Sequence, residues 1–311
     1  MWLVFRGRGG SEIYKNRVAM REFTKYINYC DQRFRGIARC QNCPYGQCIH
    51  DNPAVATDCY SCLSKIHRYV NRDLTYRCEK IIYNYVLKHG HRYASEIDKI
   101  MSYFTSNPQL PIGVNVYSVG CGPSTEIFGV INRLPNHVIH YKGFDTNQIW
   151  APLNNCVRTL FPGHDVQFED VDFFQFMAEN DDHIDILIFN YLLSDMARQK
   201  DAAFCSTFID NVVSLCEARR ISHIVINDVY LTYGTGTGYA LMEELARKLQ
   251  NNRNITWQGW RGHFATPKQF QPAYGQKCPE RLSFPIVEPA VMAYNPFSTC
   301  GSLFMLIHIQ P

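Results

Sequence analysis

From residue 114 to residue 309, short apolar stretches typical of β-strands alternate with segments of helical periodicity. Strands are expected at 114–120, 138–145, 165–171, 184–193, 222–231, 255–262 and 301–309, and helices at 125–134, 149–161, 173–180, 201–218 and 238–250. Because each of the first five strands precedes a helix, the pattern predicts an α/β fold with a mostly parallel seven-stranded sheet and helices on both faces. No clear helical pattern separates the last two strands, so an antiparallel terminal strand is expected.

The segment "SNPQLPIG" (106–113) interrupts the periodic pattern and is the expected domain boundary. It separates an N-terminal region, 1–105, from an α/β domain, 106–311. Residues 30–62 form a Cys-rich segment without sustained periodicity, and helical spacing occurs at 16–30 and again from about Asp58 to Phe104. There, Gly90 is expected to end one helix and Ser95 to begin the next.

Composition limits the class of protein. With 46% hydrophobic and 19% charged residues, the chain is not intrinsically disordered. No apolar run reaches the ~18 residues that a membrane span requires, and the first residues lack the features of a signal peptide, so a cytoplasmic protein is expected.

Residues 1–80 carry 14 Lys and Arg against 7 Asp and Glu, whereas residues 81–311 carry 17 against 21. The basic N-terminal region favours contact with a polyanion, although a solvated surface explains these charges equally well.

The first strand of the α/β domain runs into Gly-Cys-Gly-Pro, which contains Gly120 and Gly122. A glycine-rich turn at this place lets a ligand approach the backbone and exposes amides at a helix N-terminus. A tight turn with a structural role alone is the alternative. The position of the third glycine of a dinucleotide-binding turn is occupied by Thr125, and the ring of Pro123 would also crowd a pyrophosphate. The turn therefore disfavours a nicotinamide or flavin dinucleotide as the ligand.

Carboxylates follow the next two strands. Asp145 lies about 20 residues beyond the glycine turn, where a carboxylate can accept hydrogen bonds from both hydroxyls of a ribose. Asp170 and Asp172 follow the third strand and are candidate partners for an adenine amino group. Helix capping is the alternative role for such residues.

Four segments, in this order, resemble the motifs of class I S-adenosylmethionine-dependent methyltransferases, which have a Rossmann-like fold: "VYSVGCGPSTE" (116–126), "YKGFD" (141–145), "VDFF" (171–174) and "IDILIFNYLLSDM" (184–196). The resemblance implies S-adenosylmethionine as cofactor. It also implies cofactor contacts for Gly120, Cys121, Gly122, Pro123, Asp145, Asp170, Val171, Asp172 and Asn190.

The chain departs from this family at Ser118, where Asp or Glu usually helps to hold the methionyl ammonium group. Ser118 is still expected to contact the cofactor, because serine can accept a hydrogen bond, but it supplies no charge, and Glu126 is the candidate to replace part of the missing carboxylate. Methyl transfer is an in-line displacement, for which the enzyme positions a nucleophile and takes up its proton. Asn190 and Tyr191 are expected to orient the acceptor, and Asp195 to act as a base or to cap a helix. The family's amine methyltransferases of bases often have prolines after the residue equivalent to Asn190; their absence here does not favour that reaction.

The N-terminal region contains a second candidate site. Cys40 and Cys43 form one C-x2-C pair, Cys59 and Cys62 a second, and fifteen residues separate them. This spacing predicts a structural zinc site; because further Cys and His residues lie nearby, a different set of four ligands, two zinc ions or an iron–sulfur cluster are the alternatives. The alternate ligands are Cys48, His50, Cys30 and His67.

Basic and aromatic residues are interleaved in the same region, as in proteins that bind RNA. The favoured hypothesis is thus a methyltransferase acting on RNA (tRNA or rRNA) with a structural zinc. A small-molecule methyltransferase and an inactive RNA- or ribosome-binding protein are the alternatives. The sequence leaves the oligomeric state open.

Overall fold

The computed structural model describes residues 9–37, 63, 76–104, 110–229, 238–263, 280–287 and 294–310, without the side chains of residues 9–17, 104 and 263. The helices are α1 (Gly9–Gly36), α3 (Glu79–Phe104), α4 (Glu126–Arg133), η1 (Gln148–Trp150), α5 (Ala151–Leu160), α6 (Phe173–Glu179), α7 (Leu193–Gln199), α8 (Ala202–Glu217) and α9 (Gly238–Asn251). The strands are β1 (Gly113–Val119), β2 (Val138–Phe144), β3 (Asp165–Glu169), β4 (Ile184–Asn190), β5 (Ile221–Asp228), β6 (Trp257–His263), β7 (Glu280–Arg281), β8 (Thr299–Cys300) and β9 (Leu303–Ile309).

Seven strands form the central sheet in the order β3-β2-β1-β4-β5-β9-β6, and β7 pairs with β8 separately. The strands from β3 to β5 are mutually parallel, while β9 runs antiparallel to both β5 and β6. This confirms the predicted seven-stranded, mostly parallel sheet and its antiparallel last strand. The chain leaves β1 in one direction along the sheet toward β2 and β3, and later continues on the other side of β1 with β4. The carboxyl ends of β1 and β4 therefore flank the switch point where α/β sheets bind ligands.

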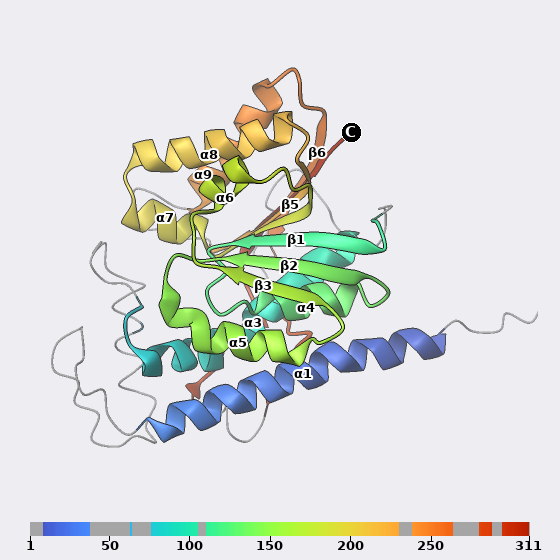
Figure 1. The fold of residues 1–311 in the computed structure, drawn as a ribbon, viewed down its shortest axis with the longest axis vertical. Coiled ribbons are helices and arrows are strands. Elements are labelled where there is room, and N and C mark those ends of the chain that lie inside the picture. The colour runs from blue at the N-terminus through green and yellow to red at the C-terminus, as the bar shows by residue number, and fades with distance from the viewer. Residues whose placement is uncertain are drawn as a thin grey trace, which may run out of the picture.

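Helices cover both faces of the sheet. Figure 1 shows α1, α3, α4 and α5 on one side and α6 to α9 on the other. Successive residues of a strand contribute to two different cores: in β4, Ile186 and Ile188 pack toward α3 and α4, whereas Leu187 and Phe189 pack toward α8. Burial on both faces explains why the strands are nearly continuous apolar runs.

The helix α3 corrects one prediction. It is a single helix of 26 residues that continues through Gly90 and Ser95, which were expected to end one helix and begin another. Gly90 lies where a Cβ would be 3.5 Å from the Thr125 side chain, and Ser95 Oγ donates to the His91 carbonyl and accepts from the Phe284 amide. Both residues therefore have packing roles within a buried helix.

Two further differences concern lengths. The helix expected at 16–30 extends over Gly9–Gly36. The strand expected at 184–193 ends at Asn190, and a short helix, α7, begins at Leu193. Within the described part of the chain, no helix has the length and hydrophobicity needed to cross a membrane.

Candidate functional site

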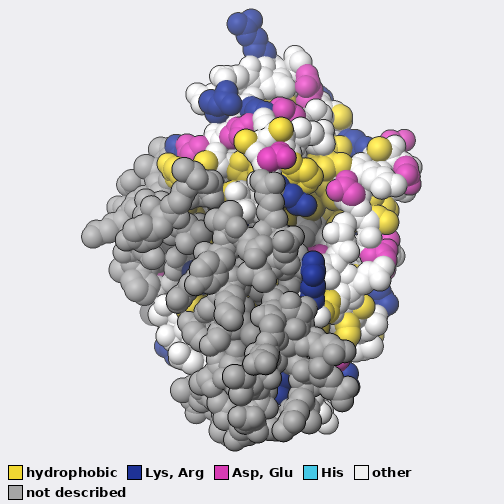
Figure 2. Space-filling model, turned by 90° about the vertical axis from the view of Figure 1, so that its left-hand side faces the viewer, with side chains coloured by type: hydrophobic (Ala, Val, Ile, Leu, Met, Phe, Trp, Pro, Cys, Tyr) yellow, Lys and Arg dark blue, Asp and Glu magenta, His cyan; other side chains and the backbone are white. Residues whose placement is uncertain are grey.

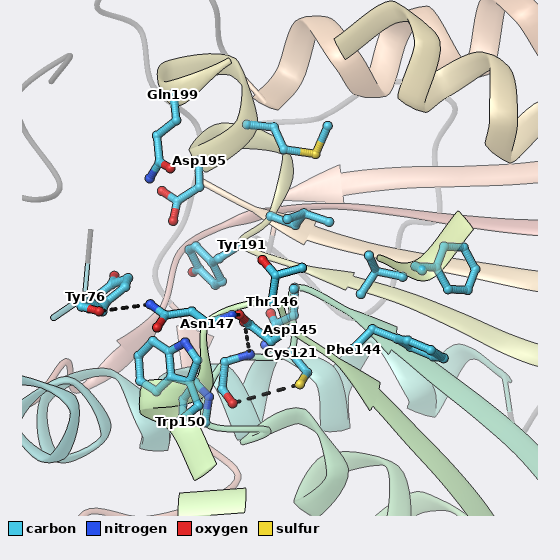
Figure 3. A pocket seen from close by; sticks show the side chains of 18 of the residues that line it. Tyr76, Cys121, Phe144, Asp145, Thr146, Asn147, Trp150, Tyr191, Asp195 and Gln199 are labelled. Carbon is cyan, nitrogen blue, oxygen red and sulfur yellow. Dashed lines mark hydrogen bonds between the residues drawn. The ribbon is translucent and has the colours of Figure 1, made fainter. Parts of the chain in front are cut away.

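A cavity of about 510 Å³ lies at the carboxyl ends of β1, β2 and β4 (Figure 3). Most of the residues predicted for the site line it: Gly120, Cys121, Gly122, Pro123, Glu126, Asp145, Val171, Asp172, Asn190, Tyr191 and Asp195. Ser118 and Asp170 lie outside its wall. The fold thus brings together residues from four separate segments at the edge of the sheet where a ligand was expected.

The glycine turn has the backbone geometry that its sequence indicated. Gly120 and Gly122 have φ angles of 63° and 50°, in the left-handed region that favours glycine. A Cβ on Gly120 would lie 2.6 Å from Cδ1 of Leu192. The Cys121 amide donates to the Phe144 carbonyl at 3.1 Å, which ties the turn to the end of β2. The turn therefore presents bare backbone to the cavity beside the residues that follow β2.

Asp145 is fixed at the end of β2 by two backbone amides. The Gly122 amide donates to its Oδ2 and the Asn147 amide to its Oδ1, both at 2.9 Å (Figure 3). Burial raises the pKa of Asp145 to about 6, although both hydrogen bonds oppose the shift. A carboxylate has about four acceptor positions, so two amides leave capacity for further donors from a ligand.

Ser118 and Glu126 form one unit below the turn. Ser118 Oγ donates to Glu126 Oε1 at 2.6 Å, and the Tyr141 hydroxyl donates to the same oxygen at 2.8 Å. Glu126 is 1% exposed, and burial raises its pKa against the hydrogen bonds from Ser118, Tyr141 and Asn190. A carboxylate thus lies beside the end of β1, but it comes from the first residue of α4.

The residues after β3 have different roles. Asp172 Oδ1 accepts from the amides of Phe174 and Gln175 and caps α6, while the residue also borders the cavity. Asp170 is exposed and accepts from Gln148 Nε2 at 2.7 Å. Of the two acidic residues predicted for an adenine, only Asp172 lies at the cavity.

The residues after β4 form the opposite side of the cavity. The hydroxyl of Tyr191 donates to Glu96 Oε2 at 2.8 Å, and its ring stacks on Tyr93 with centroids 3.9 Å apart. Asp195 lies in the first turn of α7, where its Oδ1 is 2.7 Å from Arg198. Tyr191 therefore contributes its ring to the cavity, and Asp195 its carboxylate.

An aromatic wall that the sequence motifs did not predict borders the cavity on the side of α3 and is formed by Tyr76, Tyr85, Tyr93 and Trp150. Its rings contact one another, with centroids 4.9 Å apart for Tyr76 and Trp150, 5.3 Å for Tyr76 and Tyr85, and 5.9 Å for Tyr85 and Tyr93. The spacing of Tyr85 and Tyr93, two helical turns apart, was the available signal for one face of a helix.

The cavity wall is acidic. Its carboxylates are Glu126, Asp145, Asp172 and Asp195, and among its described residues Lys200 is the one Lys or Arg. Such a wall is unfavourable for a pyrophosphate and suits a ligand that carries positive charge.

The predicted metal ligands Cys40, Cys43, Cys48, His50, Cys59, Cys62 and His67 lie outside the described residues. Of the candidates, Cys30 alone is described. It is fully buried in the apolar core, and burial raises the pKa of its thiol, which disfavours the thiolate that metals bind. The described residues contain no group of three or more side chains able to hold a metal ion.

No protein-family model matches the sequence, and no curated protein sequence matches it. Similar solved structures include the plantazolicin methyltransferase BpumL in complex with SAH (11% identity, TM-score 0.44, 82% of this chain and 96% of that chain). They also include precorrin-6y C5,15-methyltransferase from Geobacter metallireducens GS-15 (11%, 0.41, 68% and 89%). A third is the O-methyltransferase TomG from Streptomyces achromogenes in complex with SAM (10%, 0.41, 71% and 88%). All three TM-scores are below 0.5, so these similarities do not assign a function to this chain.

Proposed function

We propose that this protein is an S-adenosylmethionine-dependent methyltransferase whose cofactor binds in the cavity at the carboxyl ends of β1, β2 and β4. The observation that carries the proposal is Asp145, which two backbone amides hold at the end of β2 beside a glycine turn with two left-handed residues. A carboxylate in this place suits the two hydroxyls of a ribose.

The charge of the cavity supports this cofactor over a dinucleotide. S-adenosylmethionine has a sulfonium and an ammonium group and no phosphate, which matches a wall with four carboxylates and, among its described residues, one Lys. Thr125, which replaces the third glycine, is buried. The residues present thus fit the proposed cofactor.

Each part of the wall has an expected role. Gly120 and Gly122 let the cofactor lie against the backbone, and Glu126 replaces the carboxylate missing at Ser118 and holds the ammonium group. Val171 and Asp172 lie where the adenine is expected. When bound, S-adenosylmethionine supplies an electrophilic methyl group.

On the acceptor side, Asn190 and the ring of Tyr191 orient the acceptor. Asp195 is the carboxylate placed to take up a proton, because it borders the cavity and is only partly buried, with 38% of its side chain exposed.

As acceptor we propose RNA, tRNA or rRNA, held by the basic residues of the N-terminal region, with a small molecule as the alternative. In the described part of the face in Figure 2, positive and negative side chains are interspersed, and no single basic patch dominates. The residues proposed to contact RNA are the basic ones around the Cys pairs, beside a zinc site formed by Cys40, Cys43, Cys59 and Cys62: Arg33, Arg35, Arg39, Lys65, Arg68, Arg72 and Arg77. A protein that binds RNA without methylating it is the third possibility.

Calorimetric titration with S-adenosylmethionine and S-adenosylhomocysteine tests the cofactor site. We expect micromolar binding to the wild-type protein and at least about a hundredfold weaker binding to Asp145→Ala, since two hydrogen bonds to a charged acceptor are lost. Asp170→Ala is the matched control, because this exposed carboxylate follows the adjacent strand outside the cavity. Absence of binding to the wild type, or equal losses in both variants, would refute the assignment.

The acceptor is tested separately. Nucleic acid that co-purifies with the protein at low salt and is released at high salt would support RNA. Transfer of a labelled methyl group to that RNA distinguishes an enzyme from an RNA-binding protein without activity, and failure to retain RNA favours a small-molecule acceptor.

A further inference from the structure

We propose that Glu96, in the middle of α3, is a positioning residue for the cavity, which holds the ring of Tyr191 and the amide of Asn190 in their places. Its effect on ligand binding rests on the function proposed above, whereas its effect on the position of Tyr191 does not. Glu96 lies in the N-terminal region, outside every motif that the sequence indicated.

The Glu96 carboxylate is fully buried and is the acceptor for five donors from four parts of the chain. Its Oε1 accepts from Arg92 Nε at 2.8 Å and from the amides of Gly301 and Ser302 at 3.0 and 3.3 Å. Its Oε2 accepts from the Tyr191 hydroxyl at 2.8 Å and from Asn227 Nδ2 at 3.0 Å. One side chain thus joins α3, the end of β4, β5 and the segment before β9.

The first group that Glu96 holds is Tyr191. This residue has a φ of 59°, which residues other than glycine rarely adopt. Three contacts keep it there: its amide donates to the Asn227 carbonyl at 2.7 Å, its hydroxyl donates to Glu96, and its ring stacks on Tyr93. Because the hydroxyl is directed to Glu96, Tyr191 presents a ring face to the cavity and does not act as a proton acceptor.

The second group is Asn190, which Glu96 reaches through Asn227. Asn227 Nδ2 donates both to Glu96 and to Asn190 Oδ1, the latter at 2.9 Å. Ser302 Oγ donates to Asn227 Oδ1 at 2.5 Å and so fixes the orientation of the Asn227 amide. The Oδ1 of Asn190 is thus engaged, and Asn190 opposes the rise in the pKa of Glu126 that burial causes. Glu96 is therefore linked by hydrogen bonds through Asn227 to Asn190, a residue of the cavity wall that acts on the carboxylate expected to hold the cofactor's ammonium group.

The variant Glu96→Gln tests this role. It keeps the shape of the side chain but replaces one acceptor oxygen with a donor, so it cannot accept all five hydrogen bonds. Asp98→Asn is the matched control. Asp98 is a second fully buried carboxylate of α3, and it pairs with Asn132 and Arg133 of α4, away from the cavity. In each variant, a new NH2 group stands where a carboxylate oxygen accepted hydrogen bonds from neighbouring donors. Both variants are therefore expected to have a lower melting temperature than the wild type.

Ligand binding separates the two variants. With S-adenosylhomocysteine as the probe, we expect Glu96→Gln to bind at least about tenfold more weakly than the wild type and Asp98→Asn to bind as the wild type does. Tyr191→Phe, which keeps the ring and removes one donor, is expected to bind several-fold more weakly. Wild-type affinity in Glu96→Gln, or equal losses in Glu96→Gln and Asp98→Asn, would overturn the proposal. If Glu96→Gln does not fold, unchanged binding by Tyr191→Phe overturns it.

Crystal structures provide the readout that needs no ligand. In Glu96→Gln and in Tyr191→Phe we expect residue 191 to leave its left-handed conformation and its stack on Tyr93. If both variants keep these features, the positioning role is refuted. If the wild type does not bind S-adenosylhomocysteine, the proposed function fails, and the position of residue 191 then decides this proposal alone.

Discussion

At the scale of single residues, the protonation of Asp145 controls the proposed cofactor site. Burial raises the pKa of this carboxyl to about 6. A carboxyl with a raised pKa keeps its proton to higher pH, so the ionised fraction of Asp145 grows as pH rises through about 6. The ionised form accepts hydrogen bonds from a ribose better, and the raised pKa of Glu126 acts in the same direction.

Binding of S-adenosylhomocysteine should therefore tighten between pH 5 and pH 7.5 and then level off. At pH 5 about one tenth of Asp145 is ionised, which predicts about tenfold weaker binding than on the plateau. Calorimetry across this range gives the profile. Asp145→Asn, which does not titrate, should bind weakly and show a smaller pH dependence. A flat wild-type profile would contradict the role of Asp145.

The backbone half of the site follows from local sequence. Gly120, Gly122 and Asp145 border the cavity because the carboxyl ends of parallel strands meet at one edge of a sheet. The alternation of strands and helices along the sequence is enough to predict this. Glu126 was also predicted, as the replacement for the carboxylate missing at Ser118, but its hydrogen bond from the Ser118 hydroxyl is a tertiary contact that residue spacing does not predict. The place of the Tyr93 ring at the cavity could not be predicted from local sequence, because the position of α3 depends on tertiary packing.

At the scale of elements, the packing of α3 against α4 depends on Gly129. A Cβ at this position would lie 2.6 Å from the Asp98 amide nitrogen and 2.7 Å from the Ala94 carbonyl oxygen, both backbone atoms of α3. The two helices can approach this closely only because the residue has no side chain.

Gly129→Ala should therefore destabilise the protein by about 1–3 kcal/mol through overpacking, although alanine favours the helix by about 1 kcal/mol. Urea unfolding gives the free energy difference. Gly163→Ala is the control, because a Cβ there would meet nothing within 4 Å, and it should change stability by less than about 0.5 kcal/mol. If Gly129→Ala is as stable as the wild type, α3 can move to accommodate the added methyl group without loss of stability, and the predicted role of Gly129 is wrong.

Strands were predictable and element ends were less so. Burial on both faces makes β4, β5 and β9 apolar enough to recognise. The end of β4 was misplaced because the apolar residues of "NYLL" continue the strand pattern, whereas Tyr191 turns the chain through contacts with Tyr93 and Glu96, about a hundred residues away. In α3, Gly90 and Ser95 are local signals for helix ends, and tertiary packing overrides both.

At the scale of the whole molecule, the N-terminal region and the α/β domain share one core. Residues of α1 and α3, such as Phe23 and Ile97, pack in the same cluster as Val116 of β1. Tyr76, the first described residue after residues 64–75, borders the cavity, and its carbonyl accepts from Asn147 Nδ2 at 2.9 Å. The part of the chain that leads out of the Cys-rich segment is thus joined to the proposed site.

The segment 30–62 was predicted to lack sustained hydrophobic periodicity; α1 extends into it as far as Gly36, and beyond that a metal is the expected source of its order. Purified protein should contain zinc or iron in stoichiometric amount by elemental analysis. Cys40→Ser and Cys62→Ser should lose it and aggregate, because each removes one of four thiolates.

Cys156→Ser is the control for this experiment, since Cys156 is a half-buried thiol of α5 that packs against the core of α1, α3 and α4. It should keep its metal and remain in solution. If metal-free wild-type protein unfolds cooperatively at the same temperature as the metal-containing form, the metal has no structural role. The order of the segment would then have to come from contacts with the core that α1 and α3 share with the sheet, and Cys62→Ser would be no more harmful than Cys156→Ser.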